Sequence, residues 1–386
     1  NFQVMNVKKL LKGSLMALML PTMLLSCSEN NNEPNESEMS AAKKAIIAQC
    51  VNNVVVPTYK SLADASMDLA SVCADLKENP TQENVNKACK KWVEARKYWE
   101  LSEAFLFGAA SDYNIDPHID SWPLQKSKLD QTLSNADLIS ELDTDGAGAD
   151  GFSTLGYGLL GFHAVEYVIF RDGQPRNVSE ITKNELIFNA AVAEDLAWQT
   201  IRLEASWAGV ENVDAKKQKI LKEQELEPGT NYGEMMILAG ESGNTNYKTQ
   251  IAAMVQILQG ASDISDEVGN TKITDPVHSG NVLDVESWYS WNSIEDFTDN
   301  LRSVRNVYYG SLDGTVNANS LAAYMKKKNA DADTKVRTAI DNAIKEVSSM
   351  PAPFRNHLTA AETQKAVEAC NELMNALDNA ITEISK

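Results

Sequence analysis

Apolar residues recur at intervals of three and four along almost the whole chain, and this spacing constrains the fold most strongly. In a helix, residues so spaced share one face, which has to pack against another helix. No convincing run of alternating residues predicts strands. The sequence therefore predicts an all-α fold of helical bundles, with helices over 40–76, 81–107, 127–141, from Gly158, 180–208, 211–226, 231–260, 293–309, 318–349 and 358–385.

Two residues predict details of the first helices. Pro57 lies inside the first segment, and we expect a bend there because proline lacks the amide hydrogen that a helix uses. Thr81 stands directly before the second segment, with Asn84 three residues later, which is typical of a helix N-cap. Between these helices lies a turn with the sequence KENPT.

The length of the chain predicts two domains, because a single core rarely grows to this size. The helices of 82–96 (QENVNKACKKWVEAR) and 361–377 (AETQKAVEACNELMNAL) have similar patterns, and each follows a long helix and a proline-containing turn. This similarity between the two segments favours two related bundles, over 40–175 and 176–386, that arose by duplication. The alternative is that any two amphipathic helix hairpins look alike.

The N-terminus is typical of an exported lipoprotein. Three lysines within residues 8–12 precede an apolar stretch from Leu15 to Leu25, which is too short to span a bilayer and suits a signal peptide over 1–26. The stretch runs into Leu-Leu-Ser-Cys, which resembles a lipobox and predicts lipidation of Cys27. The alternative is an ordinary secretory signal with an incidental cysteine. Residues 27–39 are polar and acidic, and predict a flexible tether. We therefore expect the protein in the cell envelope, on the outer-membrane, periplasmic or surface face, held to the membrane by lipid.

The net charge and the cysteines exclude some classes of partner and site. The formal net charge is −19, and loss of the signal lysines would make it more negative, so we expect no nucleic-acid partner. Cys50, Cys73, Cys89 and Cys370 fit no zinc module. Cys73 and Cys89 flank the KENPT turn, so a disulfide between them is one hypothesis. The other is four small buried thiols.

His163 and Glu166 are the first candidates for a metal-binding site. Three residues apart on a helix, they share one face, where an imidazole and a carboxylate can close on one metal ion. Their neighbours are apolar, so the carboxylate needs a partner. A buried hydrogen bond between the two is the simpler alternative.

Glu103 is a second unexpected carboxylate. It falls on one helical stripe with Trp92, Arg96 and Trp99, on the side that we expect to face the core. An ion pair with Arg96 would explain it, and so would a metal ion.

These residues carry a family resemblance. The segments WELSEAFLFGAASDYNIDPHIDSWP and GFHAVEYVIF resemble two signatures of the imelysin-like family, the second being its GxHxxE motif, and ESWYSWNSIEDFTDNLRSVRNVYYGSLDG resembles a third block. The resemblance runs from about residue 90 to 315. One departure is Ala109, where the family often has proline.

The resemblance implies a pair of four-helix-type bundles with a cleft between or beside them. It also implies a metal site made of Glu103, Asp120, His163 and Glu166, with Trp122 and Arg305 at the cleft. One imidazole and three carboxylates suit a divalent or ferric ion, iron before zinc or copper. His118, His278 and His357 lie outside the motifs, and we expect them on the surface or in loops.

Three functions remain open. The first is a metal-binding lipoprotein of iron acquisition, with an iron transporter or other envelope protein as partner. The second is a metallopeptidase, although the chain has no H-E-x-x-H motif to supply paired ligands and a base. The third is a non-catalytic module that binds peptide or polysaccharide.

Overall fold

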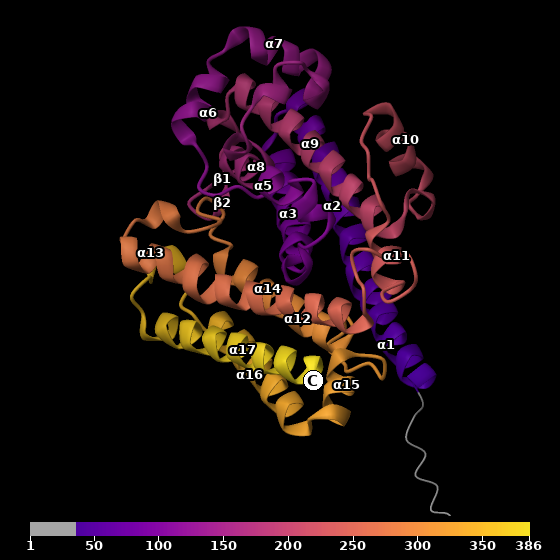
Figure 1. Ribbon diagram of the computed structural model, residues 1–386. Coiled ribbons are helices and arrows are strands. Elements are labelled where there is room, and N and C mark those ends of the chain that lie inside the picture. The colour runs from indigo at the N-terminus through magenta and orange to yellow at the C-terminus, as the bar shows by residue number, and fades with distance from the viewer. Residues whose placement is uncertain (1–35) are drawn as a thin grey trace, which may run out of the picture.

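The computed structural model describes residues 36–386, which form an all-α protein of two packed helical bundles (Figure 1). The predicted signal peptide, Cys27 and residues 27–35 of the predicted tether lie outside this part of the chain. Helix α1 (Glu36–Cys50) already begins inside the predicted tether. Its first turn carries two glutamates, which a helix N-terminus favours. None of the helices within residues 36–386 is long and apolar enough to cross a membrane.

A π-helical turn lies just before Pro57, the residue near which the sequence predicts a bend. Helix α1 runs through this turn, Val51–Val55, into α2 (Val56–Glu78), and the amide of Val56 bonds to the carbonyl of Val51. Proline has no amide hydrogen, so the regular bonding pattern of the helix is interrupted at Pro57, and the wider turn lies at this interruption. Thr81 caps α3 (Gln82–Glu100) by accepting from the amide of Asn84, which confirms the predicted N-cap.

The first bundle is built around α2. Helices α3 and α9 (Lys183–Ala208) pack along α2, and α8 (Gly161–Ile169) lies against α3 and α9. Helix α9 follows the predicted boundary at 175, yet it packs in this bundle. Smaller elements cover its ends: α4 (Ala109–Asp112), α5 (Ile115–Ile119), α6 (Lys126–Leu133), α7 (Ala136–Asp145), α10 (Ala215–Glu223), α11 (Tyr232–Ile237), and the antiparallel pair β1 (Phe170–Arg171) and β2 (Gln174–Pro175).

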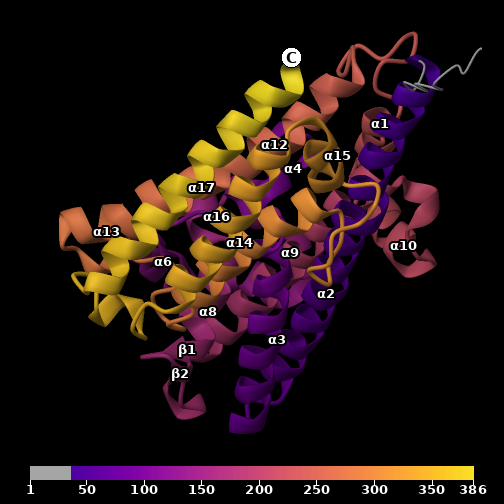
Figure 2. The ribbon, with the colours of Figure 1, turned by 90° about the horizontal axis from the view of Figure 1, so that it is seen from below.

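The second bundle comes from the C-terminal part of the chain. Its main helices are α12 (Gln250–Glu267), α14 (Ser293–Tyr309), α16 (Ala330–Ser348) and α17 (Ala361–Ser385), with α13 (Thr274–Ser279) and α15 (Leu321–Lys328) at its edges. Figure 2 shows these helices lying side by side across the first bundle. One hydrophobic core runs through both bundles, from Ile46 to Ile384.

The bundles meet where α3 ends. The short turn Glu103–Phe105 after α3 packs on α12 and α14. Gly260 makes this approach possible, because a Cβ at that position would lie 2.3 Å from the carbonyl oxygen of Ala104. Acidic side chains predicted to face the core therefore come to lie between the two bundles.

Several predicted helices are interrupted. The segment 231–260 divides into α11 and α12, and the connection contains Gly240 and Gly243 with φ of 83° and 94°, which ends the helix. The segment 318–349 divides at Asn329, whose side chain caps α16. The loop predicted after residue 107 contains α4 and α5. The overall helical prediction is confirmed, but the pattern alone did not reveal these breaks.

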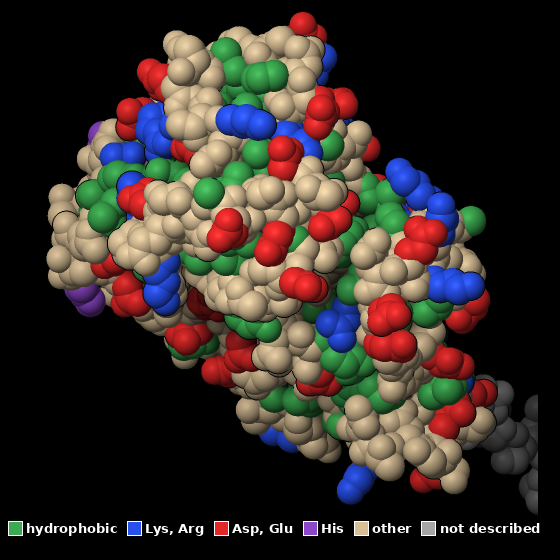
Figure 3. All heavy atoms as spheres, turned by 90° about the horizontal axis from the view of Figure 1, so that it is seen from above, with side chains coloured by type: hydrophobic (Ala, Val, Ile, Leu, Met, Phe, Trp, Pro, Cys, Tyr) green, Lys and Arg blue, Asp and Glu red, His purple; other side chains and the backbone are tan. Residues whose placement is uncertain are grey.

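The four cysteines in the described part of the chain are free and buried. The disulfide considered between Cys73 and Cys89 is therefore wrong, and the alternative of four buried thiols is confirmed. Cys89 instead donates a hydrogen bond to the carbonyl of Ile169, at 3.4 Å. On the face shown in Figure 3, acidic and basic side chains are interspersed, and basic residues do not gather into one patch there.

Candidate metal centre

The stripe predicted on α3 is buried, and it forms one wall of the site. Trp92, Arg96 and Trp99 are fully buried, and so is Glu100 at the last position of the helix. Because α3 ends there, Glu103 lies on the following turn, and only 7% of it is exposed. Arg96 pairs with Glu100, Asp120, Glu286 and Asp296 rather than with Glu103.

Asp120 lies at the centre of the site, directly after α5. The indole nitrogen of Trp99 donates to its Oδ2 at 2.7 Å, and Arg96 pairs with its Oδ1. The Nε2 atom of His163 lies 3.1 Å from the same Oδ1. Burial would raise the pKa of Asp120, but Arg96 and His163 outweigh it and hold that pKa well below its usual range. Asp120 is therefore an ionised carboxylate between two nitrogen groups.

Gly161 positions His163 beside Asp120. Its φ is +71°, and a Cβ there would lie 2.0 Å from the carbonyl oxygen of Ile119, the residue before Asp120. Only glycine lets the start of α8 approach the α5 backbone so closely. The carbonyl of Phe162 accepts a hydrogen bond from Trp92 at 2.8 Å, which fixes the same turn to α3. The glycine of the GxHxxE motif is thus a requirement of packing.

Glu166 orients His163. Its Oε2 lies 3.0 Å from Nδ1 of His163, and its Oε1 accepts hydrogen bonds from the amides of Tyr289 and Ser290 and from the Ser290 hydroxyl. Because each ring nitrogen faces a carboxylate, both carry a proton in the metal-free protein, Nδ1 toward Glu166 and Nε2 toward Asp120. A carboxylate that accepts so many bonds serves as an outer partner of a histidine ligand rather than as a ligand.

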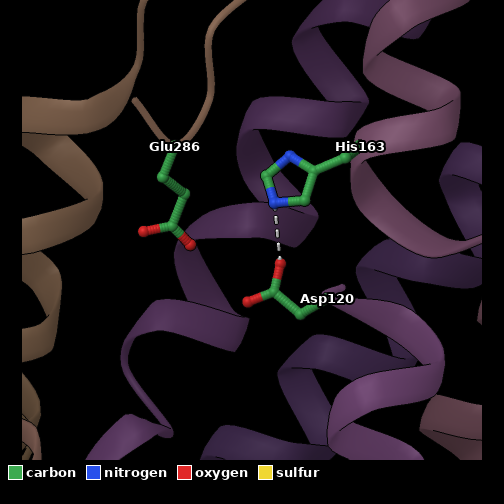
Figure 4. Close-up of side chains that lie close together, drawn as sticks. All are labelled: Asp120, His163 and Glu286. Carbon is green, nitrogen blue, oxygen red and sulfur yellow. Dashed lines mark ion pairs between the residues drawn. The ribbon is translucent and has the colours of Figure 1, made fainter. Parts of the chain in front are cut away.

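Glu286 completes the inner group, and it comes from the second half of the chain. Ligand atoms of Asp120, His163 and Glu286 all lie within 4.8 Å of one another. Figure 4 shows the Glu286 side chain pointing from its loop toward the imidazole edge that faces Asp120. Nε2 of His163 is buried and makes no well-directed hydrogen bond, and neither does Oε2 of Glu286. A histidine nitrogen aimed at two carboxylates is a donor set that fits a metal ion.

A second group of carboxylates adjoins the first through Asp120. Oxygens of Glu100, Glu103 and Asp120 also lie within 4.8 Å of one another. Burial raises the pKa of Glu100 and of Glu103 well above the usual range, although nearby cations oppose this. The cation nearest to Glu103 is Lys272, whose Nζ lies 3.9 Å from its Oε1.

Acidic groups outnumber basic groups at this site. Two permanent cations, Arg96 and Lys272, face five carboxylates that are almost completely buried: Glu100, Glu103, Asp120, Glu286 and Asp296. Burial raises the pKa of Asp296 to about 7, despite the nearby Arg96. Buried carboxylates in excess need protons or a further cation. The site is therefore electrostatically suited to a multivalent cation.

A cavity of about 690 Å³ leads to these residues. Asp120, Glu103, Lys272 and Glu286 line its inner part. Its remaining walls are largely acidic or polar and come from both bundles: Leu106, Asp116, Trp122, Pro123, Glu267, Thr271, Asp275, His278, Ser279 and Asp284. Burial and the nearby Asp120 raise the pKa of Asp116 to about 6. A cation can thus enter along carboxylates.

The two predicted cleft residues lie in different places. Trp122 lines the cavity, and its ring centroid lies 4.7 Å from that of His163. Arg305 is not among the lining residues and lies beside Gly314. Of the other histidines, His278 is exposed at the cavity, while His118 bonds to Asp195 at 2.8 Å.

Four residues of the site were not predicted as site members. Glu286 opens the ESWYSW segment, so a carboxylate at the start of an aromatic block was an available signal. Glu100 follows Arg96 by four residues on the same helix face, and this spacing was a second available signal. For Asp296 and Lys272 the sequence offers no such signal, because nothing local distinguishes them from other charged residues.

Comparison with known proteins shows the family of the chain. The family profile described as Imelysin matches residues 55–380, which is most of the chain. The chain belongs to the Imelysin family. Iron-regulated protein A of Synechococcus elongatus, a relative, is 26% identical over 310 residues, covering 80% of this chain and 76% of that protein.

Solved imelysin-like structures share the fold. A crystal structure from Parabacteroides distasonis that carries the name iron-regulated protein A precursor has a TM-score of 0.78 and 29% identity, covering 92% of this chain and 97% of that one. An imelysin-like protein from Psychrobacter arcticum has a TM-score of 0.61 at 13% identity, covering 89% and 93%, and shows the fold alone. The chain is thus an imelysin similar to proteins named as iron-regulated.

Proposed function

We propose that this imelysin binds a multivalent metal ion, iron in preference to zinc or copper, and serves iron acquisition rather than catalysis. The observation that carries the proposal is the buried Nε2 of His163, which points at the carboxylates of Asp120 and Glu286 without a directed hydrogen bond. The likeness to proteins named iron-regulated supports iron as the cargo.

The structure suggests a ligand set that differs in part from the predicted one. Asp120, His163 and Glu286 are the inner ligands in this proposal. Glu103 adjoins them, because it belongs to the second group of carboxylates, which shares Asp120. Glu166 holds the imidazole in place from the outer side. Carboxylate oxygens with one imidazole suit iron, and such mixed sites also accept zinc and copper.

Calorimetric titration with iron, zinc and copper tests this proposal. We expect one ion per chain. We also expect each of His163→Ala, Asp120→Asn and Glu286→Gln to weaken binding by a factor of about 10 to 100, because each removes a ligand. His357→Ala is the matched control, since His357 is exposed and is not among the residues that line the cavity. Unchanged affinity in all three folded site variants would refute the site.

A metallopeptidase is the weaker proposal. Such an enzyme needs a general base beside the metal-bound water. Glu166, the carboxylate of the motif, accepts bonds from His163 and from the segment at 289–290, so it is poorly placed to take a proton from water. Cleavage of general protein substrates that a chelator abolishes and zinc restores would reverse this ranking.

The proposal also places the protein in the cell envelope. It rests there on the lysines, the apolar stretch and the Leu-Leu-Ser-Cys sequence before and at Cys27, which lie outside the described residues. A lipid-held metal-binding protein would pass its ion to a transporter or other envelope protein. The acidic cavity is the route by which the ion would enter and leave.

A further inference from the structure

The Lys272 side chain occupies an unusual place in the site. Its Nζ lies 3.2 Å from Glu286, 3.9 Å from Glu100 and from Glu103, and 4.0 Å from Glu267. Only 8% of the side chain is exposed. Burial alone would lower the pKa of this ammonium, but the surrounding carboxylates outweigh it and raise the pKa well above the usual range. The ammonium group of Lys272 is thus surrounded by carboxylates from both bundles.

A special backbone element carries this lysine. Lys272 belongs to the π-helical turn Val268–Ile273, which follows α12 and forms part of the cavity wall. Such turns insert a residue into a helix and often occur at functional sites.

The position beside Lys272 has the donor set of a second cation site. Oxygens of Glu100, Glu103 and Asp120 lie within 4.8 Å of one another, and Asp120 also belongs to the group with His163 and Glu286. In two-metal sites the ions lie about 3.5–4 Å apart, so neighbouring ligand groups share carboxylates. The buried Nε2 of His163 points into the same cluster.

We propose that the carboxylate cluster has two cation positions, one for the metal ion and one filled by the ammonium group of Lys272. This inference rests on the proposed function. Lys272 lies 3.9 Å from Glu100 and Glu103, longer than the 2.7–2.9 Å of a strong charge-assisted hydrogen bond, so it balances their charge without binding them closely.

Lys272 thereby determines which ions the site accepts. It contacts Glu286, a ligand of the first position, at 3.2 Å, so an incoming ion has to compete with the ammonium for that carboxylate. A monovalent ion gains no charge in this exchange, whereas a divalent or trivalent ion does. Lys272 thus limits the cluster to one multivalent ion.

The test is zinc stoichiometry, measured by elemental analysis and calorimetry on the full chain. We expect one zinc ion in the wild type and two in Lys272→Met, because the second group of carboxylates then keeps only Arg96 as a neighbouring cation. The triple variant Lys272→Met, Glu100→Gln, Glu103→Gln should return to one ion. Lys272→Arg should also bind one zinc ion, because it keeps the positive charge. Lys90→Met, at an exposed position, controls for the loss of a positive charge.

Each outcome decides the matter. No zinc in the wild type would contradict the proposed function, and the inference with it. One ion in both the wild type and a folded Lys272→Met, or two in the wild type, would overturn the inference alone. If Lys272→Met unfolds, circular dichroism with added zinc decides: refolding supports a second cation position, and failure to refold contradicts it.

Discussion

His163 is the residue on which the proposed metal site depends most. Burial lowers the pKa of its imidazole, but the carboxylates of Asp120 and Glu166 outweigh burial and the nearby Arg96, and raise the pKa to about 9. The folded-state pKa thus lies above the ordinary value of 6.5. The bound proton stabilises the fold fully below about pH 6.5, and this contribution is lost as pH rises through about 9.

Metal binding should therefore release the proton of His163. A metal takes the neutral imidazole, so we expect affinity for zinc to rise about tenfold per pH unit from pH 7 and to level off near 9. Competition with a chelator of known affinity measures this. Glu166→Gln removes one carboxylate beside the imidazole, so its profile should level off at a lower pH. A flat profile in the wild type would contradict a role for Nε2 as ligand.

At the scale of elements, the site depends on two close backbone approaches. The start of α8 contacts the end of α5 through Gly161, and the turn after α3 contacts α12 through Gly260. The first brings His163 to Asp120, and the second brings the carboxylates after α3 to the second bundle. Both glycines act through packing between helices, where even one methyl group is felt.

Gly161→Ala should damage both the fold and the site. The new Cβ would meet the Ile119 backbone, and alanine is strained at a φ of +71°, so we expect the free energy of unfolding to fall by about 2–4 kcal/mol. Denaturant unfolding measures this. Gly156→Ala is the matched control, because its φ is −80° and nothing lies within 4 Å of the added Cβ. Equal stability of the two variants would disprove the packing role.

At the scale of the whole molecule, the features that the sequence can predict are those with local determinants. Helices follow from apolar periodicity, and Glu103, Asp120 and His163 each belong to a recognisable local motif. Glu286 and Lys272 reach the site only because the second bundle packs on the first, at a separation from Asp120 of more than a hundred residues. Spacing put Glu166 on the face of His163, but only the fold showed that the segment at 289–290 engages its other oxygen.

The proposed envelope location is a separate property of the whole protein. Cys27→Ala should move the protein out of the membrane fraction, because the predicted lipid attachment is removed. Labelling with a fatty acid and fractionation test this. An unlabelled wild type, or a variant that stays with the membrane, would contradict lipidation at Cys27.

The most direct measurement is anomalous X-ray diffraction from crystals of the protein soaked in zinc or iron. We expect one strong peak between the two bundles, about 2.0–2.2 Å from Nε2 of His163 and from a carboxylate oxygen of Asp120. Glu286 should contribute a further ligand at a similar distance. A peak elsewhere, or none at saturating metal, would contradict the claim that this site binds the ion.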